Sequence, residues 1–345
     1  MAVVGVAAVL GGLAPRAEGW SGQQHLQITR AAGKNVPTEM GDFRAFSWPL
    51  AYPSVYPDLW KLYDPSEGVR HYFEPDRLRR GTDLSALPRD LDAALASIRM
   101  RADEIGTAPW AIAELTRQMT DAMRTNDWMW AARTGAALGH YVGDLHMPLH
   151  ATKNFNGQES GQNGVHTRIE SDLIKSFFRS ELIQCGPATY IEDPFQAALG
   201  WATESYQLSP KWLRADHEAS RAAGRHTDTE DYYLRMWELL EESIVRRISE
   251  AATDLSSLYY TAWVDAGRPE IPPPFEELPP YSIFTGVDIQ GAESSPGHPP
   301  RSQSKYDRVI LGFIGGIAFL VLMSAVWQSI GRRRKKPGKP TGNGH

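Results

Sequence analysis

Apolar residues recur at helical spacing through most of this chain, and this periodicity constrains the fold more than any other feature. Residues three and four apart on a helix share one face, so such a pattern forms an apolar stripe that packs against neighbouring helices. The pattern runs through residues 87–105, 110–124, 127–146, 167–180 and 229–266, while strand alternation never persists. The sequence therefore predicts an all-α, multi-helix domain over residues 20–267, with capping residues 227–230 before its last long helix.

The C-terminal part of the chain has the composition of a membrane anchor. Prolines punctuate residues 268–306, which favours an extended spacer. Residues 309–330 carry no charge and would form a helix roughly 33 Å long, so we predict a transmembrane helix at 307–331. The basic tail 332–345 follows at once and predicts a cytoplasmic C-terminus, with the domain on the periplasmic or cell-surface side. A buried core helix is the alternative, which the adjoining basic cluster disfavours.

The N-terminal end resembles a secretory signal. Residues 2–13 form an apolar run that is too short to span a bilayer, and the small residues Ala17 and Gly19 stand where a signal peptidase reads. No basic residue precedes the run, so a buried N-terminal element stays as the alternative. We predict a signal peptide at residues 1–19 and a domain that begins at Trp20.

Cysteine content and charge exclude some functions. Cys185 is the only cysteine, so the chain has no intrachain disulfide and no cysteine-ligated zinc. A net charge of -5 gives no reason to expect a broad basic surface for nucleic acid. Attraction of a polyanion would have to come from a local patch or from bound metal.

Histidines and carboxylates are concentrated between residues 139 and 170. His140 and Asp144 are four residues apart and share one helix face, and Pro148 limits that helix so that His150 can turn toward the same centre. Neutral imidazoles and carboxylates are ligands that zinc accepts. His146 lies two residues from Asp144 and points elsewhere, so we interpret it as support for a ligand.

A second pair, His166 and Glu170, repeats the four-residue spacing on another helix. One such pair is explained as well by a helical ion pair or a core histidine. Two pairs and a further histidine within 31 residues favour a metal site.

The stretch GHYVGDLHMPLHATKN, residues 139–154, resembles the signature of the bacterial zinc-dependent phospholipases C and their relatives, the single-strand-specific zinc nucleases. Asn154 comes one position later than the asparagine of that family. The resemblance extends over residues 20–267 and implies a mainly helical domain that holds three zinc ions.

The resemblance also assigns the ligands. One zinc would be held by Asp58, His71, His140 and Asp144, a second by His150, His166 and Glu170, and the third by His25, a bridging Asp144 and the amino group and carbonyl of Trp20. The last assignment requires that Trp20 be the first residue of the mature chain. The resemblance makes Asp58 the candidate catalytic base as well, with Asp64 as an alternative for its role.

The sequence combines features of the phospholipases C with features of the zinc nucleases. Glu170 as the final ligand and the short gap from His150 to His166 resemble the phospholipases C, whereas the five-residue step from Trp20 to His25 and residues 71–76 resemble the nucleases. We favour a phospholipase C-like enzyme that hydrolyses the phosphodiester bond of phospholipids.

Two alternatives stay open. A single-strand-specific nuclease would release 5′-nucleotides, and its base-stacking candidates are Tyr72, Phe73 and Phe155. In a membrane-anchored binding module, zinc would only join helices. No protein partner can be inferred.

Overall fold

The computed structural model describes residues 21–61 and 64–275, which form helices joined by short turns and contain no strand. This confirms the all-α prediction for the described part of the chain. The α-helices are α1 (Gly22–Lys34), α2 (Ser47–Ala51), α3 (Tyr56–Trp60), α4 (Leu91–Ile98), α5 (Ala102–Ile105), α6 (Ala108–Arg124), α7 (Trp128–Leu145), α8 (Val165–Thr167), α9 (Ile174–Phe177), α10 (Pro194–Ala222) and α11 (Glu230–Asp265). Shorter 3-10 and π-helical turns connect several of them.

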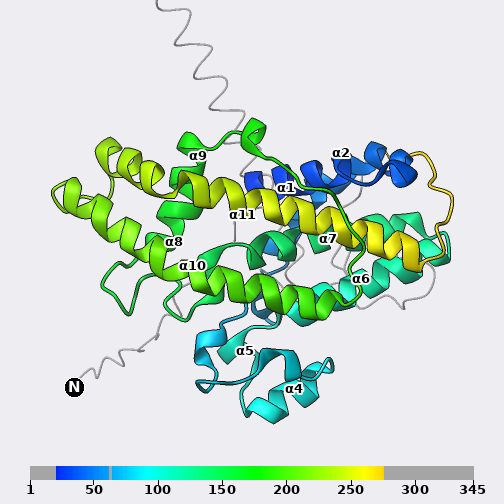
Figure 1. Cartoon of the computed structure of the whole chain (residues 1–345), viewed down its shortest axis with the longest axis horizontal. Coiled ribbons are helices and arrows are strands. Elements are labelled where there is room, and N and C mark those ends of the chain that lie inside the picture. The colour runs from blue at the N-terminus through cyan, green and yellow to red at the C-terminus, as the bar shows by residue number, and fades with distance from the viewer. Residues whose placement is uncertain (1–20, 62–63, 276–345) are drawn as a thin grey trace, which may run out of the picture. The chain divides into compact units, whose positions relative to one another are not determined.

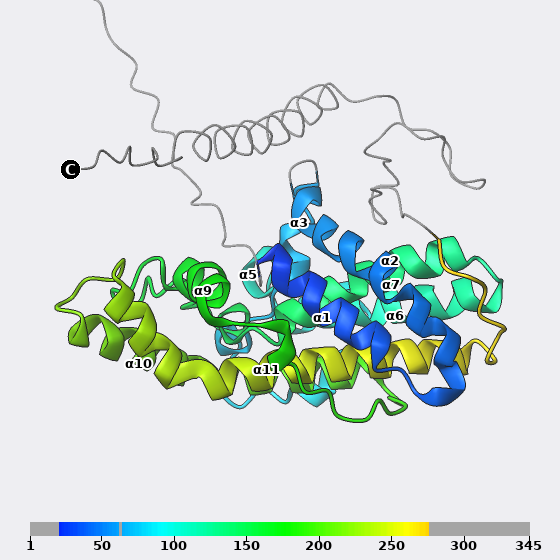
Figure 2. The same cartoon turned by 90° about the horizontal axis from the view of Figure 1, so that it is seen from above.

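Helix α7 is the central element of the bundle. It contacts α1, α2, α6, α10 and α11, and almost all of its residues are buried. Helices α10 and α11 pack against each other in opposite directions, as the colour gradient in Figure 1 shows. Figure 2 shows α1 and α11 crossing the same side of the bundle. Because α7 carries His140 and Asp144, these candidate ligands lie in the interior.

Two of the predicted helices are interrupted. Residues 87–105 form α4 and α5, separated where Arg99 adopts a left-handed backbone (φ 55°) that ends α4. Residues 167–180 comprise the end of α8, a π-helical turn at Arg168–Leu173 and α9, after which Phe178 is extended. No glycine or proline marks either break, so the apolar periodicity runs through both.

Helix α10 was not among the helices that the sequence predicts, and Pro210 in its interior explains the omission. Proline has no N–H to donate to the carbonyl four residues earlier, which here is that of Tyr206. The Ser209 hydroxyl donates to this carbonyl instead, at 2.8 Å. The helix therefore continues through a residue that usually ends one.

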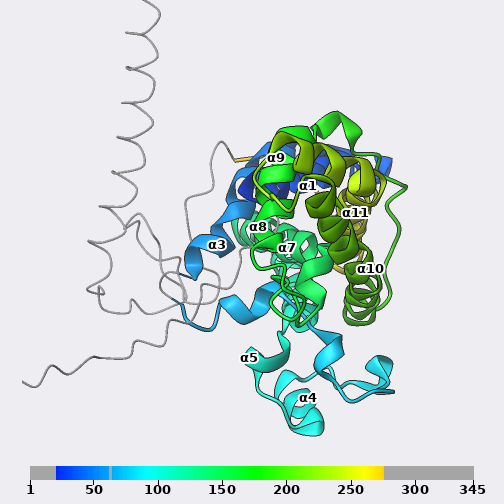
Figure 3. The ribbon, with the colours of Figure 1, turned by 90° about the vertical axis from the view of Figure 1, so that its left-hand side faces the viewer.

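Several predicted segments lie outside the described residues: the signal peptide at 1–19, Trp20, most of the spacer, the transmembrane helix and the basic tail. Among the helices that are described, none has the length and apolar character needed to cross a bilayer. Figure 3 views the bundle from its left-hand side, with α3 at the edge of the coloured ribbon.

Candidate metal centre

Three groups of histidines and carboxylates in the described part of the chain could hold metal ions. They are His25 with His140 and Asp144, Asp58 with His71 and His140, and His150 with His166 and Glu170; within each group the candidate ligand atoms lie within 4.8 Å of one another. All members except the partly buried Asp58 are buried. The first two groups share His140, so they adjoin.

The carboxylate of Asp144 lies between the first two groups. Its Oδ1 is 3.3 Å from Nε2 of His25, and its Oδ2 is 2.8 Å from Nδ1 of His71 and 3.3 Å from Nε2 of His140. Oδ1 therefore faces His25 of the first group, and Oδ2 faces His71 and His140 of the second. This is the arrangement that a bridging carboxylate requires.

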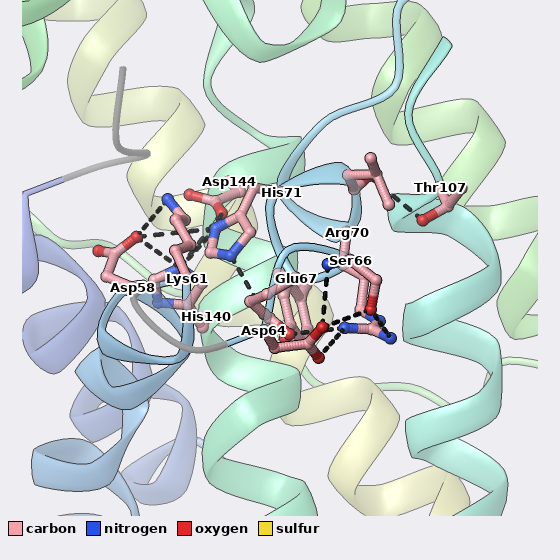
Figure 4. A network of polar contacts seen from close by, with 12 residues as sticks. Asp58, Lys61, Asp64, Ser66, Glu67, Arg70, His71, Thr107, His140 and Asp144 are labelled. Atoms are coloured by element: carbon pink, nitrogen blue, oxygen red, sulfur yellow. Dashed lines mark hydrogen bonds and ion pairs between the residues drawn. The ribbon is translucent and has the colours of Figure 1, made fainter. Parts of the chain in front are cut away.

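Asp58 closes the second group from the solvent side. Its Oδ1 lies 3.5 Å from Nε2 of His140 and 3.7 Å from Nδ1 of His71, and these two ring nitrogens are 3.0 Å apart. Figure 4 shows these side chains turned toward one another, with Lys61 beside Asp58. Ligands of a tetrahedral zinc lie about 3.3 Å from one another, because each is about 2.0 Å from the ion. The distances in the second group scatter around that value.

The third group is formed by two turns that follow α7. His150 belongs to the 3-10 turn Pro148–Ala151, and His166 and Glu170 lie on α8 and the π-helical turn. Nε2 of His166 is 2.7 Å from Oε2 of Glu170 and 3.1 Å from Nε2 of His150. The three ligand atoms converge on one point.

Some buried polar atoms in the first group lack a hydrogen-bond partner among the described residues. Neither ring nitrogen of His25 has one, and Oδ1 of Asp144 has none although it approaches His25. Burial of such groups without partners costs free energy, and native proteins rarely leave them so. A metal ion at this position would be a partner for Nε2 of His25 and for Oδ1 of Asp144, so the donor set fits a metal.

Backbone carbonyls orient three of the histidines. The Nδ1–H of His140 donates to the carbonyl of Ser54 at 2.8 Å, that of His150 donates to His71, and that of His166 donates to Phe155 at 3.0 Å. A histidine that donates through Nδ1 keeps the lone pair on Nε2 for a metal. In each case Nε2 is the atom that faces the group.

His71 is oriented differently, by a residue that sequence reasoning missed. Its Nδ1 faces the metal groups, and its Nε2 lies 3.2 Å from Oε1 of the buried Glu67. Glu67 also accepts hydrogen bonds from the hydroxyl of Tyr141 and, at 2.7 Å, from Arg70 (Figure 4). Glu67 precedes His71 by four residues, the same spacing as in the two ligand pairs, so the signal was present in the sequence.

The ionisable side chains of the candidate centre shift one another's pKa values. Burial and the neighbouring His140 lower the pKa of His25 to about 4, against the opposing effect of Asp144. Burial would also lower the pKa of His140, but the carboxylates of Asp144 and Asp58 outweigh it and raise that pKa to about 10. Without metal, His140 therefore holds a proton between two carboxylates. A metal ion would displace that proton.

Three further predictions concern single residues. Asp64, the alternative to Asp58, accepts hydrogen bonds from Ser66 and belongs to none of the three groups. The two ring nitrogens of His146 lie 2.8 Å from the carbonyl of Val142 and 2.9 Å from Asp254. Neither of these two partners is a member of the groups, so the supporting role of His146 stays a prediction. Trp20 lies outside the described residues.

Two comparisons with known proteins bear on this resemblance. No family model matches the chain, and no curated protein matches it either. The resemblance to zinc phosphodiesterases therefore rests on the motif residues and their spacing.

Proposed function

We propose that this chain is a zinc-dependent phosphodiesterase that hydrolyses phospholipids in the manner of a phospholipase C. The observation that carries the proposal is the presence of three groups of imidazoles and carboxylates in the described part of the domain, two of which share His140 and adjoin at Asp144. Such ligands suit zinc, and clustered cations suit an anionic phosphodiester.

The ligand count favours catalysis over a purely structural role. Structural zinc sites are closed by four protein ligands, whereas catalytic sites keep one position open. The third group offers three ligands, and two of them, His150 and His166, line a small pocket together with His71. A substrate that entered this pocket would meet two of the groups at once.

Bound zinc would neutralise charge on the phosphodiester and make a water molecule more acidic. The chain itself supplies Lys61, which lines the same pocket and whose ammonium lies 2.7 Å from Oδ1 of Asp58. That ammonium adds positive charge where a phosphate oxygen would bind.

Asp58 is better suited to hold a cation than to take a proton. Burial would raise its pKa, but His140, Lys61 and His71 outweigh this effect and hold the pKa well below its usual range. A carboxylate so stabilised as an anion is a weak base. We therefore favour the ligand role for Asp58 over the predicted role of catalytic base.

A single-strand-specific nuclease is the second candidate, because two aromatic residues line the pocket. Tyr72 and Phe155 border it and could stack on a base. Phe73, the third candidate from the sequence, is fully buried and packs against Trp110, so it cannot contact a substrate.

The proposal includes the location that the sequence predicts. We infer a domain on the extracytoplasmic side, joined to a membrane by the predicted helix at 307–331 and the spacer before it.

The test uses the full chain purified in non-ionic detergent. Elemental analysis should find close to three zinc ions per chain, and none would contradict the proposal. The protein is then given phosphatidylcholine in mixed micelles and, separately, single-stranded DNA. Diacylglycerol with phosphocholine supports the phospholipase, and 5′-nucleotides alone support the nuclease. Hydrolysis of neither substrate by the zinc-loaded chain favours the binding module.

His150→Ala is the test variant for this assay, and His217→Ala is its matched control. The test variant removes one of only three ligands in the third group, so we expect hydrolysis to fall at least 100-fold while the other two groups keep their metal. His217→Ala changes a histidine on α10 that belongs to none of the groups, and should leave the rate unchanged.

A further inference from the structure

One surface of the domain is apolar where a helix usually presents polar residues. Residues 47–60 run helically through α2, the 3-10 turn Tyr52–Val55 and α3. The large side chains Trp48, Tyr52 and Leu59 are 52%, 65% and 42% exposed. They are four and seven residues apart, so they follow one side of the helical segment. We call this side the apolar face.

The composition of the apolar face is unusual. The residues of segment 47–60 that reach solvent are Trp48, Pro49, Tyr52, Val55, Asp58 and Leu59. Asp58 is the only one of them that carries a charge at neutral pH, and it is a candidate metal ligand. The opposite side of the segment packs on α1 and α7 through buried residues such as Leu50 and Trp60. A patch of several large exposed apolar side chains is typical of an interaction site.

We propose that the apolar face rests on the surface of a phospholipid bilayer. Tryptophan and tyrosine are the residues that proteins place at the boundary between lipid tails and headgroups. A cation accompanies them here, because the guanidinium of Arg30 lies 4.0 Å from the centre of the Trp48 ring. Such an arrangement lets the aromatic ring enter the interface while the cation meets headgroup phosphates.

The size of the face argues against a second copy of the chain as its occupant. With these exposed fractions, the three large side chains offer roughly 300 to 400 Å². A stable protein interface buries about 800 Å² on each partner. Partial insertion into a bilayer has no such minimum, because several apolar side chains and a cation give reversible binding.

The remainder of the sequence agrees with a bilayer as the occupant. Residues 276–306 separate the described domain from the predicted transmembrane helix, and a 31-residue segment can span at most roughly 100 Å. The domain could therefore reach the membrane that holds it. Because Asp58 belongs to the same segment, the contact would bring the metal centre to the lipid surface. The inference goes beyond the proposed function and holds whichever phosphodiester is hydrolysed.

Site-directed spin labelling of the full chain in vesicles tests the proposal. With Cys185→Ser as background, a nitroxide is attached at Tyr52→Cys, and at Leu234→Cys as the control. Leu234 is 44% exposed on α11, a helix that contributes no residue to the three groups. The chain is reconstituted in phosphatidylcholine and phosphatidylglycerol vesicles, with the relaxation agents present on both sides. Collision rates with oxygen, which concentrates in lipid, and with a water-soluble nickel chelate are then compared.

We expect a several-fold higher ratio of oxygen to nickel collisions at position 52 than at position 234. Equal ratios, with position 52 open to the nickel chelate, would overturn the proposal by showing a face in water. Shielding of position 52 from both reagents would overturn it as well, because it would show that protein covers the face. Trp48→Cys provides a second label position on the same face if the Tyr52 variant loses helical circular dichroism. Zinc content and hydrolysis do not enter this measurement, so its failure is separate from failure of the proposed function.

Discussion

At the scale of single residues, the candidate centre depends on which ring nitrogen of each histidine is kept for a metal. Three histidines donate through Nδ1 to backbone carbonyls. These acceptors belong to the main chain, so a side-chain substitution does not remove them. His71 instead depends on the carboxylate of Glu67. A buried carboxylate that orients a histidine also raises the basicity of that ligand. Glu67 is therefore the supporting residue most accessible to mutation.

Glu67→Ala should weaken metal binding at the group of Asp58, His71 and His140 by about 10- to 100-fold, because outer partners of histidine ligands have effects of this size. Glu67→Gln keeps an acceptor without the charge and should weaken binding less. Competition with a chromophoric chelator measures each affinity. Glu218→Gln, exposed on α10, is the control. Unchanged affinity in a folded Glu67→Ala protein would show that the carboxylate does not orient His71.

The stability of the metal-free chain should depend on pH in both directions from about 6.5, the ordinary pKa of histidine. The pKa of His25 is lowered to about 4 in the folded chain, so between pH 6.5 and 4 the unfolded chain binds more protons and stability falls as pH falls. The pKa of His140 is raised to about 10, so its contribution is complete below pH 6.5 and is lost as pH rises toward 10.

Urea denaturation in the presence of chelator, followed by circular dichroism from pH 5 to 9.5, measures this profile. The loss on the alkaline side is the more specific part, because ionised carboxylates do not titrate there. His140→Gln should remove that loss. An alkaline limb of the same slope in the variant would assign the effect to another group.

At the scale of elements, the approach of α1 to α7 depends on two glycines. A Cβ at Gly139 would lie 2.4 Å from Oγ1 of Thr29, and one at Gly143 would lie 2.9 Å from Nδ1 of His25. Both distances are too short for a real contact. The absence of side chains at these positions lets α1 lie close enough for His25 to stack on His140, with ring centres 3.8 Å apart.

Gly143→Ala should displace His25 and weaken the group of His25, His140 and Asp144, while the group around His150 keeps its affinity. Overpacking of this kind costs about 1 to 3 kcal/mol of stability. The added methyl group would also gain about 1 kcal/mol of helix propensity, which sets the control. Gly200→Ala lies on α10 with no atom within 4 Å of the new Cβ, and should stabilise the chain. Equal effects of the two substitutions, measured by urea denaturation and metal titration, would refute close packing as the cause.

At the scale of the whole molecule, the candidate centre joins segments that are distant in sequence. Its residues come from α1, α3, α7 and the turns that carry His71, His150 and Glu170. A ligand that binds only the folded chain stabilises it by mass action. Metal in such a centre would therefore join segments that lie between α1 and the π-helical turn.

Chelation should lower the melting temperature, and zinc should restore it. At a free zinc concentration of 100 times the Kd, one site contributes about 2.7 kcal/mol, which corresponds to roughly 5 to 11 °C for a domain of this size. Magnesium at the same concentration should not restore stability, because it prefers oxygen ligands. Scanning calorimetry on the full chain measures the change. Identical melting curves with and without zinc would show that the centre does not bind it.

Much of the candidate centre was accessible from local spacing alone. His140 with Asp144 and His166 with Glu170 are pairs within single helical segments, so a four-residue interval suffices to bring each pair together. The role of Glu67 was missed although it has the same interval to His71. Helix α10 was missed because a serine hydroxyl compensates for Pro210, and sequence periodicity does not show such compensation.

By itself, the sequence determined the helical class, the ligand types and the pairs that one helix brings together, because these depend on residues within a turn or two of each other. The tertiary structure alone decided the rest. It placed His25 beside Asp144, brought Asp58 rather than Asp64 next to His71 and His140, and turned His146 toward Asp254. It also left Trp48 of α2 and Tyr52 of the following 3-10 turn facing solvent. Each of these outcomes depends on which helices pack together, and that is settled by the burial of the whole core rather than by local spacing.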